Sequence, residues 1–76
     1  MTKVPFKAEE LKVGDIITMP RLDRKEEAQR WLIVDVAHDL VRVIVLLDSG
    51  NRYGWLGKLL SFAKCEIDTD KWRLLC

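Results

Sequence analysis

WLIVDVAHDLVRVIVLLDSG, residues 31–50, is the stretch that decides the fold expected for this chain. It holds two runs rich in β-branched residues, 31–37 and 40–47, separated by His38–Asp39. Such runs form strands, and both residues of the connection tolerate the positive φ of a tight hairpin turn. The second run ends at Asp48-Ser49-Gly50, where we expect a type I turn with Gly50 in the left-handed position of a bulge. The stretch therefore predicts an antiparallel hairpin that leads into a further turn.

Further strands are expected on both sides of this hairpin. Gly14–Asp15 indicates an entry turn before a strand over 16–19, which Pro20 ends. Residues 21–30 are highly charged and lack an apolar stripe, so they predict a long solvated loop. After the turn at 48–50, the pattern predicts a strand over 51–55, a single 3-10 turn over 57–60, a short strand over 65–67, and a last strand or docked tail over 71–75. The chain is thus expected to be all-β.

Composition limits the class of protein further. The 76 residues are 49% hydrophobic and 33% charged, which is typical of one small folded domain. The formal charge of +1 lacks the basic excess of a dedicated nucleic-acid binder. No leader sequence is visible, and no apolar run approaches the ~18 residues of a membrane span. Cys65 and Cys76 indicate two reduced thiols rather than a disulfide framework, so we expect a cytoplasmic protein without membrane contact.

Side-chain alternation in the central hairpin predicts which residues form the core. Because i and i+2 share a face of a strand, placing Asp35 and Arg42 in solvent assigns seven apolar residues to the core face. These are Leu32, Val34, Val36, Val41, Val43, Val45 and Leu47. The opposite face is then apolar as well, with Trp31, Ile33, Ile44 and Leu46. Such a face needs a cover, and three are open: the C-terminal Trp72–Leu75 segment, a second copy, or a partner protein.

The order of these features resembles the SH3-like small β-barrel of KOW and Tudor-type modules. A Gly-Asp before the first strand, a long polar loop, two strands joined by a short turn, the Asp48-Ser49-Gly50 turn and Trp55 carry the resemblance. It is particularly similar to short SH3-like barrel proteins encoded by bacteriophages, and it covers roughly residues 11–67. The resemblance implies a single barrel of five to six short antiparallel strands with a one-turn 3-10 helix. Residues 1–10 would form an N-terminal arm and residues 68–76 a C-terminal extension.

Catalytic and cofactor chemistry find little support in the sequence. His38, the only histidine, lies in the expected turn beside Asp39, where a base and its orienting group do not form easily. Cysteine and histidine lack zinc-ligand spacing, and the glycines of 50–57 interrupt strands instead of opening a helix as a phosphate loop does. We therefore expect a protein that is not an enzyme, with no catalytic, cofactor-binding or metal-binding residues and no cofactor.

A binding module is the function that remains. For a protein partner, either a host protein or a second copy, the candidate residues are Trp31, Ile33, Ile44, Leu46, Arg52, Tyr53 and Trp55, because aromatic residues and arginine are enriched at interface hot spots. The phage resemblance implies an accessory protein that binds and modulates a host protein in the host cytoplasm. The alternatives are a homodimeric assembly protein and a KOW- or Tudor-like nucleic-acid binder with candidate contacts at Arg21, Arg24, Lys25 and Arg30. Whether Tyr53 and Trp55 face the interior or line a binding groove stays open.

Overall fold

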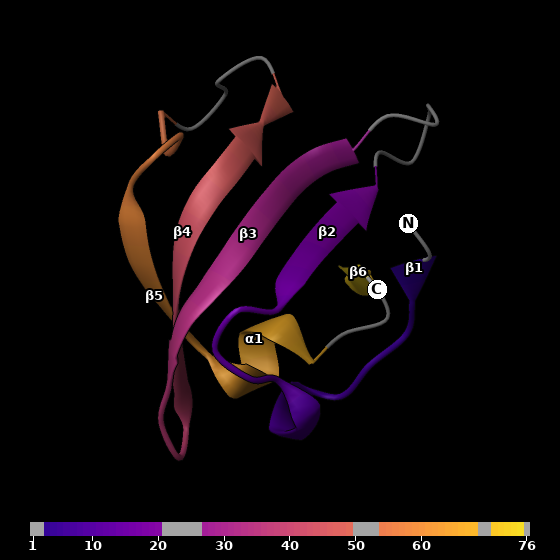
Figure 1. Ribbon diagram of the computed structural model, residues 1–76, viewed down its shortest axis with the longest axis vertical. Helices are drawn as coiled ribbons and strands as arrows, with labels where there is room; N and C mark the ends of the chain where they lie inside the picture. Colours follow the sequence, from indigo (N-terminus) through magenta and orange to yellow (C-terminus); the bar gives the residue numbers. More distant parts are fainter. Residues whose placement is uncertain (1–2, 21–26, 50–53, 69–70, 76) are drawn as a thin grey trace.

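The computed structural model describes residues 3–20, 27–49, 54–68 and 71–75, which form a six-stranded sheet in the order β1-β6-β2-β3-β4-β5 (Figure 1). All neighbouring strands are antiparallel. The strands are β1 (Lys3–Val4), β2 (Ile16–Pro20), β3 (Glu27–Val36), β4 (Leu40–Asp48), β5 (Leu59–Ala63) and β6 (Arg73–Leu75). Two short helical turns complete the described chain: the 3-10 turn η1 (Ala8–Glu10) and α1 (Lys64–Ile67). The expectation of a small all-β domain is confirmed.

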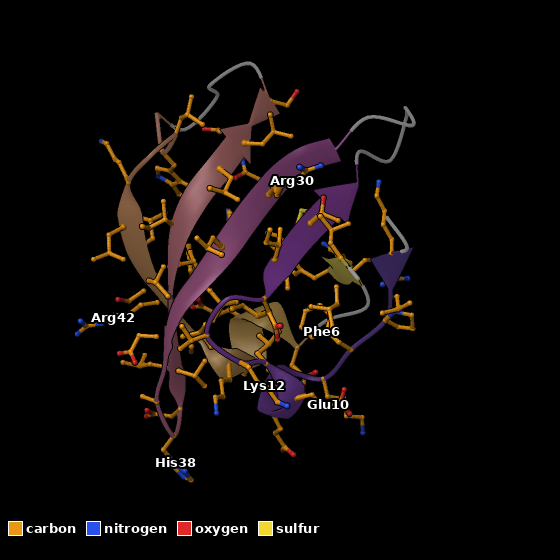
Figure 2. All side chains as sticks on the ribbon, in the orientation of Figure 1. Phe6, Glu10, Lys12, Arg30, His38 and Arg42 are labelled. Carbon is orange, nitrogen blue, oxygen red and sulfur yellow. The ribbon has the colours of Figure 1, made fainter. Side chains whose placement is uncertain are left out.

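The central hairpin follows the sequence closely. Ala37 N–H donates to the Leu40 carbonyl at 2.9 Å, which closes the two-residue connection His38–Asp39 between β3 and β4. His38 lies at the tip of this hairpin, and Arg42 projects away from the sheet (Figure 2). Strand β3 begins at Glu27, so the last part of the expected 21–30 loop is strand instead. It forms a strand because Glu27 and residues 29–32 pair with β2.

The region after β4 differs from the expectation. Strand β5 covers residues 59–63 and so includes the last two residues of the 3-10 turn expected over 57–60. Helix α1 covers residues 64–67, where a strand over 65–67 was expected. The reason is packing: Leu60 and Phe62 lie opposite Val43 and Val41 in the ladder and pack against the core. The 3-10 turn of the structure lies near the N-terminus, over Ala8–Glu10. The strand expected over 51–55 falls mostly outside the described residues.

Both ends of the chain contribute to the sheet. Strand β6 pairs with β2 on one side and with β1 on the other, so the expected arm and extension each supply a strand. The edges of the sheet are β1 and β5. Over the described residues no pairing joins these two edges, and closure of the sheet into a barrel stays a prediction.

The core fills the concave side of the sheet. Ile17, Trp31, Ile33, Val41, Val43 and Val45 supply it from the three central strands, and each is at most 5% exposed. Leu11, Ile67 of α1 and Trp72 join the same cluster. The short α1 lies across one end of the sheet (Figure 1). Residues distant in sequence thus enclose one small core.

Candidate binding surface

The face assignment of β3 made from sequence is wrong for residues 31–33, whereas Val36 packs against the core as expected. Trp31 is 5% exposed and Ile33 is completely buried, so both belong to the core. In the ladder, Trp31 lies opposite Val45 and Ile33 lies opposite Val43. Directly opposite residues share a face of the sheet. Trp31 and Ile33 therefore point to the same side as the buried valines and belong to the core cluster.

A β-bulge in β3 explains the error. The register shifts between Ile33 and Asp35, so that Val34 is an extra residue on β3. Asp35 then lies opposite Arg42, and both are exposed, as expected. A bulge interrupts the alternation of side chains, so counting back from Asp35 in steps of two inverts the rest of the strand.

The aromatic residues show what covers this part of β3. The Trp31 ring stacks on Phe62 with centroids 4.4 Å apart and an interplanar angle of 11°. Its other neighbour is Trp72, at a centroid distance of 4.2 Å. The C-terminal segment thus packs on Trp31 inside the core, with Trp72 at 4% exposure, whereas the cover expected from sequence was for the opposite face.

A second bulge, in β4, exposes two leucines. Leu47 pairs with Arg30 and Val45 pairs with Trp31, which leaves Leu46 as the extra residue. Leu46 is 42% exposed and Leu47 is 37% exposed. Leu47 was expected in the core, and the bulge puts Asp48 there instead, at 5% exposure. The expectation that Leu46 lies outside the core is confirmed.

The convex side of the sheet carries a continuous line of apolar residues. Successive ladder pairs join one residue from each of five neighbouring strands: Leu75, Ile16, Leu32, Ile44 and Leu59. We call this line the outer row. The first four are half-buried and Leu59 is 59% exposed. All five lie outside the core cluster and outside the residues packed against it. With Leu46 two positions along β4, the outer row is most open at the β4–β5 end.

Sequence reasoning found Ile44 and Leu46 but missed Leu59. The run Leu59-Leu60-Ser61-Phe62-Ala63 is uncharged, lies between Lys58 and Lys64, and has the length of a strand. That composition is a strand signal, and the expected 3-10 turn concealed it. Leu59 is a member of the outer row because it lies opposite Ile44.

A buried polar network lies at the opposite end of β3 from the hairpin tip. Gln29 Nε2 donates to Asp48 Oδ1 at 2.6 Å, and Gln29 Oε1 accepts from Trp31 Nε1 at 3.1 Å. Thr18 Oγ1 donates to the Gln29 carbonyl at 3.0 Å. Trp55 N–H donates to Asp48 Oδ2 at 3.4 Å. The residues of this network hold one another in place, and we assign the network a structural role.

Trp55 faces partly inward. It is half-buried, packs against the core, and lies with its ring centroid 6.1 Å from that of Phe62. Arg52 and Tyr53, the other candidates from this stretch, fall outside the described residues. Of the candidate partner-binding residues, the structure thus keeps Ile44 and Leu46 on the convex face and brings Trp31, Ile33 and Trp55 to the other face.

The candidate nucleic-acid contacts are represented by a single described residue. Arg30 is half-buried on β3, opposite Thr18 on one side and Leu47 on the other (Figure 2). Arg21, Arg24 and Lys25 fall outside the described residues, so their grouping on a surface is still a prediction.

Residues 3–20, 27–49, 54–68 and 71–75 contain no group of three or more His, Cys, Asp or Glu side chains placed to hold a metal ion. Within these ranges there is also no helix with the length and apolar character needed to span a membrane.

The comparisons with known proteins leave the chain without an assigned family: no protein-family model, no curated protein and no solved structure matches it.

Proposed function

We propose that this chain is a non-enzymatic protein-binding module that binds its partner through the convex face of β4 and β5. The observation that supports this is the exposure of Leu46 (42%) and Leu59 (59%) beside Ile44 at one end of the outer row. Large contiguous apolar patches on a protein surface mark interaction sites. The fully buried centre of a protein interface is more apolar than the rest of the protein surface.

The resemblance to short SH3-like phage proteins indicates what kind of partner the chain binds. It implies an accessory protein that binds and modulates a host protein in the bacterial cytoplasm. A small sheet with an exposed apolar line acts by covering a surface of its target, and such a protein needs no chemistry of its own. The apolar character of the surface favours a protein partner over nucleic acid, whose recognition depends on phosphate contacts.

Affinity capture from bacterial lysate tests the proposal. The baits are the wild-type chain, Leu46→Asp, and the matched control Val13→Asp, since Val13 is 65% exposed in the turn before β2, outside the outer row. We expect wild type and Val13→Asp to recover the same protein and Leu46→Asp to lose it, with all three baits folded by circular dichroism. Recovery of one protein set by all three baits would contradict the proposal.

Two further measurements address the alternatives. Sedimentation at rising concentration detects a homodimer, and self-association that Leu46→Asp abolishes would replace the host-protein proposal by the assembly proposal. Titration with single-stranded and duplex nucleic acid tests the KOW- or Tudor-like alternative. Binding at low salt that weakens steeply as salt rises would favour that alternative.

A further inference from the structure

The outer edge of β5 shows how a partner could bind. β5 is an edge strand, and over the described residues no other strand lies along its outer side (Figure 1). An edge strand presents unpaired N–H and C=O groups to which another chain can add. Proteins commonly protect such edges with charged residues, proline or bulges within the strand. The sequence of β5, Leu59-Leu60-Ser61-Phe62-Ala63, has no charged residue and no proline.

The hydrogen bonds at both ends of β5 show which of its backbone groups point outward. Near one end, Gly57 N–H donates to the Val45 carbonyl at 2.8 Å, and Val45 N–H donates to the Lys58 carbonyl at 3.2 Å. At the other end, Lys64 N–H donates to the Asp39 carbonyl at 3.0 Å. Hydrogen-bonded positions alternate along an antiparallel ladder. The positions that bond to β4 are therefore Leu60 and Phe62, and the backbone groups of Leu59, Ser61 and Ala63 point away from it.

We propose that β5 accepts an extended segment of the partner protein, which adds to the sheet as a further strand. Main-chain hydrogen bonds to Leu59, Ser61 and Ala63 would hold the segment, and alternate side chains would extend the outer row beyond Leu59. This is the recognition mode in which backbone bonds give affinity and side-chain contacts give specificity. The proposal rests on the proposed function, because it names the form of the partner at the same end of the outer row.

Charge around the edge favours another protein over a second copy. Antiparallel pairing of two β5 strands about Ser61 places Lys58 of each copy opposite Lys64 of the other, and like charges directly opposite are destabilising. Arg42, on the same face, is paired with Ser61 in the ladder and is exposed. Two carboxylates lie at the Lys64 end: Asp39, whose carbonyl accepts from Lys64 N–H, and Glu66, two residues after Lys64. The expected segment is therefore apolar in its middle, with an acidic residue at the end that meets Lys58.

A displayed library of peptides of about nine residues, long enough to span β5 at ~3.4 Å per residue, supplies the probe. We expect selection to enrich alternating apolar and β-branched residues, to place Asp or Glu at one end, and to exclude proline from the middle. The selected peptide is then synthesised, and amide hydrogen exchange is measured by NMR on the full chain. In the free protein, Leu60 and Phe62 should exchange slowly and Leu59, Ser61 and Ala63 fast, and the peptide should slow the second set.

Two variants at one position separate backbone pairing from side-chain contact. Ser61→Pro removes the outward N–H, a substitution that edge strands tolerate, and should weaken peptide binding at least about tenfold. Ser61→Ala keeps the N–H and should bind within about threefold of wild type. If Ser61→Pro fails to fold, the exchange pattern of the wild-type chain with and without peptide tests whether the peptide pairs with the backbone of β5.

Three results would overturn the inference. If the library enriches no sequence, the β5 edge is not a peptide-binding site. The proposed function is then tested separately, by the capture experiment with Leu46→Asp. If the peptide binds but does not slow exchange at Ser61 and Ala63, the proposed binding function still holds, and the peptide does not bind by adding a strand to β5. Concentration-dependent protection of these amides without peptide identifies a second copy as the occupant and overturns the choice of a partner protein.

Discussion

The rings of Trp31 and Trp72 lie with their centroids 4.2 Å apart, which joins the centre of β3 to the segment that leads into β6. Both side chains are at most 5% exposed, and Phe62 also stacks on Trp31. One aromatic group thus joins β3, β5 and the segment that precedes β6. The C-terminal segment is therefore part of the structural core.

Trp72→Ala should lower the free energy of unfolding by about 3–5 kcal/mol, because it removes a buried indole and leaves a cavity beside Trp31. A domain of this size has roughly 4–11 kcal/mol in total, so the variant should be close to unfolding at room temperature. Urea denaturation followed by circular dichroism measures the loss.

Leu56→Ala is the control for this variant, since Leu56 is 55% exposed and should change stability by less than about 0.5 kcal/mol. A Trp72→Ala protein as stable as Leu56→Ala would show that the C-terminal segment does not pack on Trp31.

The bond from Gln29 Nε2 to Asp48 Oδ1 at 2.6 Å predicts coupling between these two residues. Gln29→Leu should destabilise the protein by about 1–3 kcal/mol or more, because Asp48 loses a donor and Trp31 Nε1 loses its acceptor inside the core. Urea denaturation of Gln29→Leu, Asp48→Leu and the double variant measures the coupling.

The double variant should cost less than the sum of the two single variants, with a coupling of about 0.5–3 kcal/mol. Arg42→Leu, on the exposed side of β4, is the matched control and should stay within about 0.5 kcal/mol of wild type. Strictly additive costs would mean that the two side chains do not depend on each other.

How far the sequence predicts this structure depends on where the strands are regular. The alternation of side chains is not interrupted between Val41 and Val45 of β4, and it predicted correctly that Val41, Val43 and Val45 lie in the core. In β3, Val34 is an extra residue, and alternation counted from Asp35 gave the wrong face for Trp31. A bulge depends on which residues of two strands pair, and that register is set by tertiary packing as well as local sequence. The same limit applies to the candidate surface, where Leu46 was found and Leu59 was missed.

Gly57 has φ of +77° in the turn that leads into β5, where Lys58 N–H donates to the Trp55 carbonyl at 2.8 Å. A Cβ at this position would meet nothing within 4 Å, so the cost of Gly57→Ala comes from the backbone alone. We expect a loss of about 1–2 kcal/mol in unfolding free energy. Gly57→Asn should lose less, because asparagine tolerates the left-handed region. Thermal denaturation of both variants tests this order, and equal stability of wild type and Gly57→Ala would exclude a left-handed residue here.

Charged substitutions on adjacent β4 residues should separate the two faces of the sheet. Val45 is 1% exposed and Leu46 is 42% exposed. Val45→Asp buries an unpaired carboxylate and should cost at least about 3–5 kcal/mol, enough to unfold most of the protein. Leu46→Asp places the carboxylate in water and should cost less than about 1 kcal/mol. Tryptophan fluorescence during urea denaturation measures both losses.

The same pair links stability to binding. Leu46→Asp should keep the cooperative unfolding of wild type and lose the captured partner, whereas a variant that loses the partner only because it unfolds would behave like Val45→Asp. Leu59→Asp, at a side chain 59% exposed on the neighbouring strand, should repeat the result of Leu46→Asp. If Leu46→Asp and Leu59→Asp both unfold the protein, the outer row is part of the core and the convex face is not a binding surface. If both remain folded and retain the partner, binding lies elsewhere on the molecule.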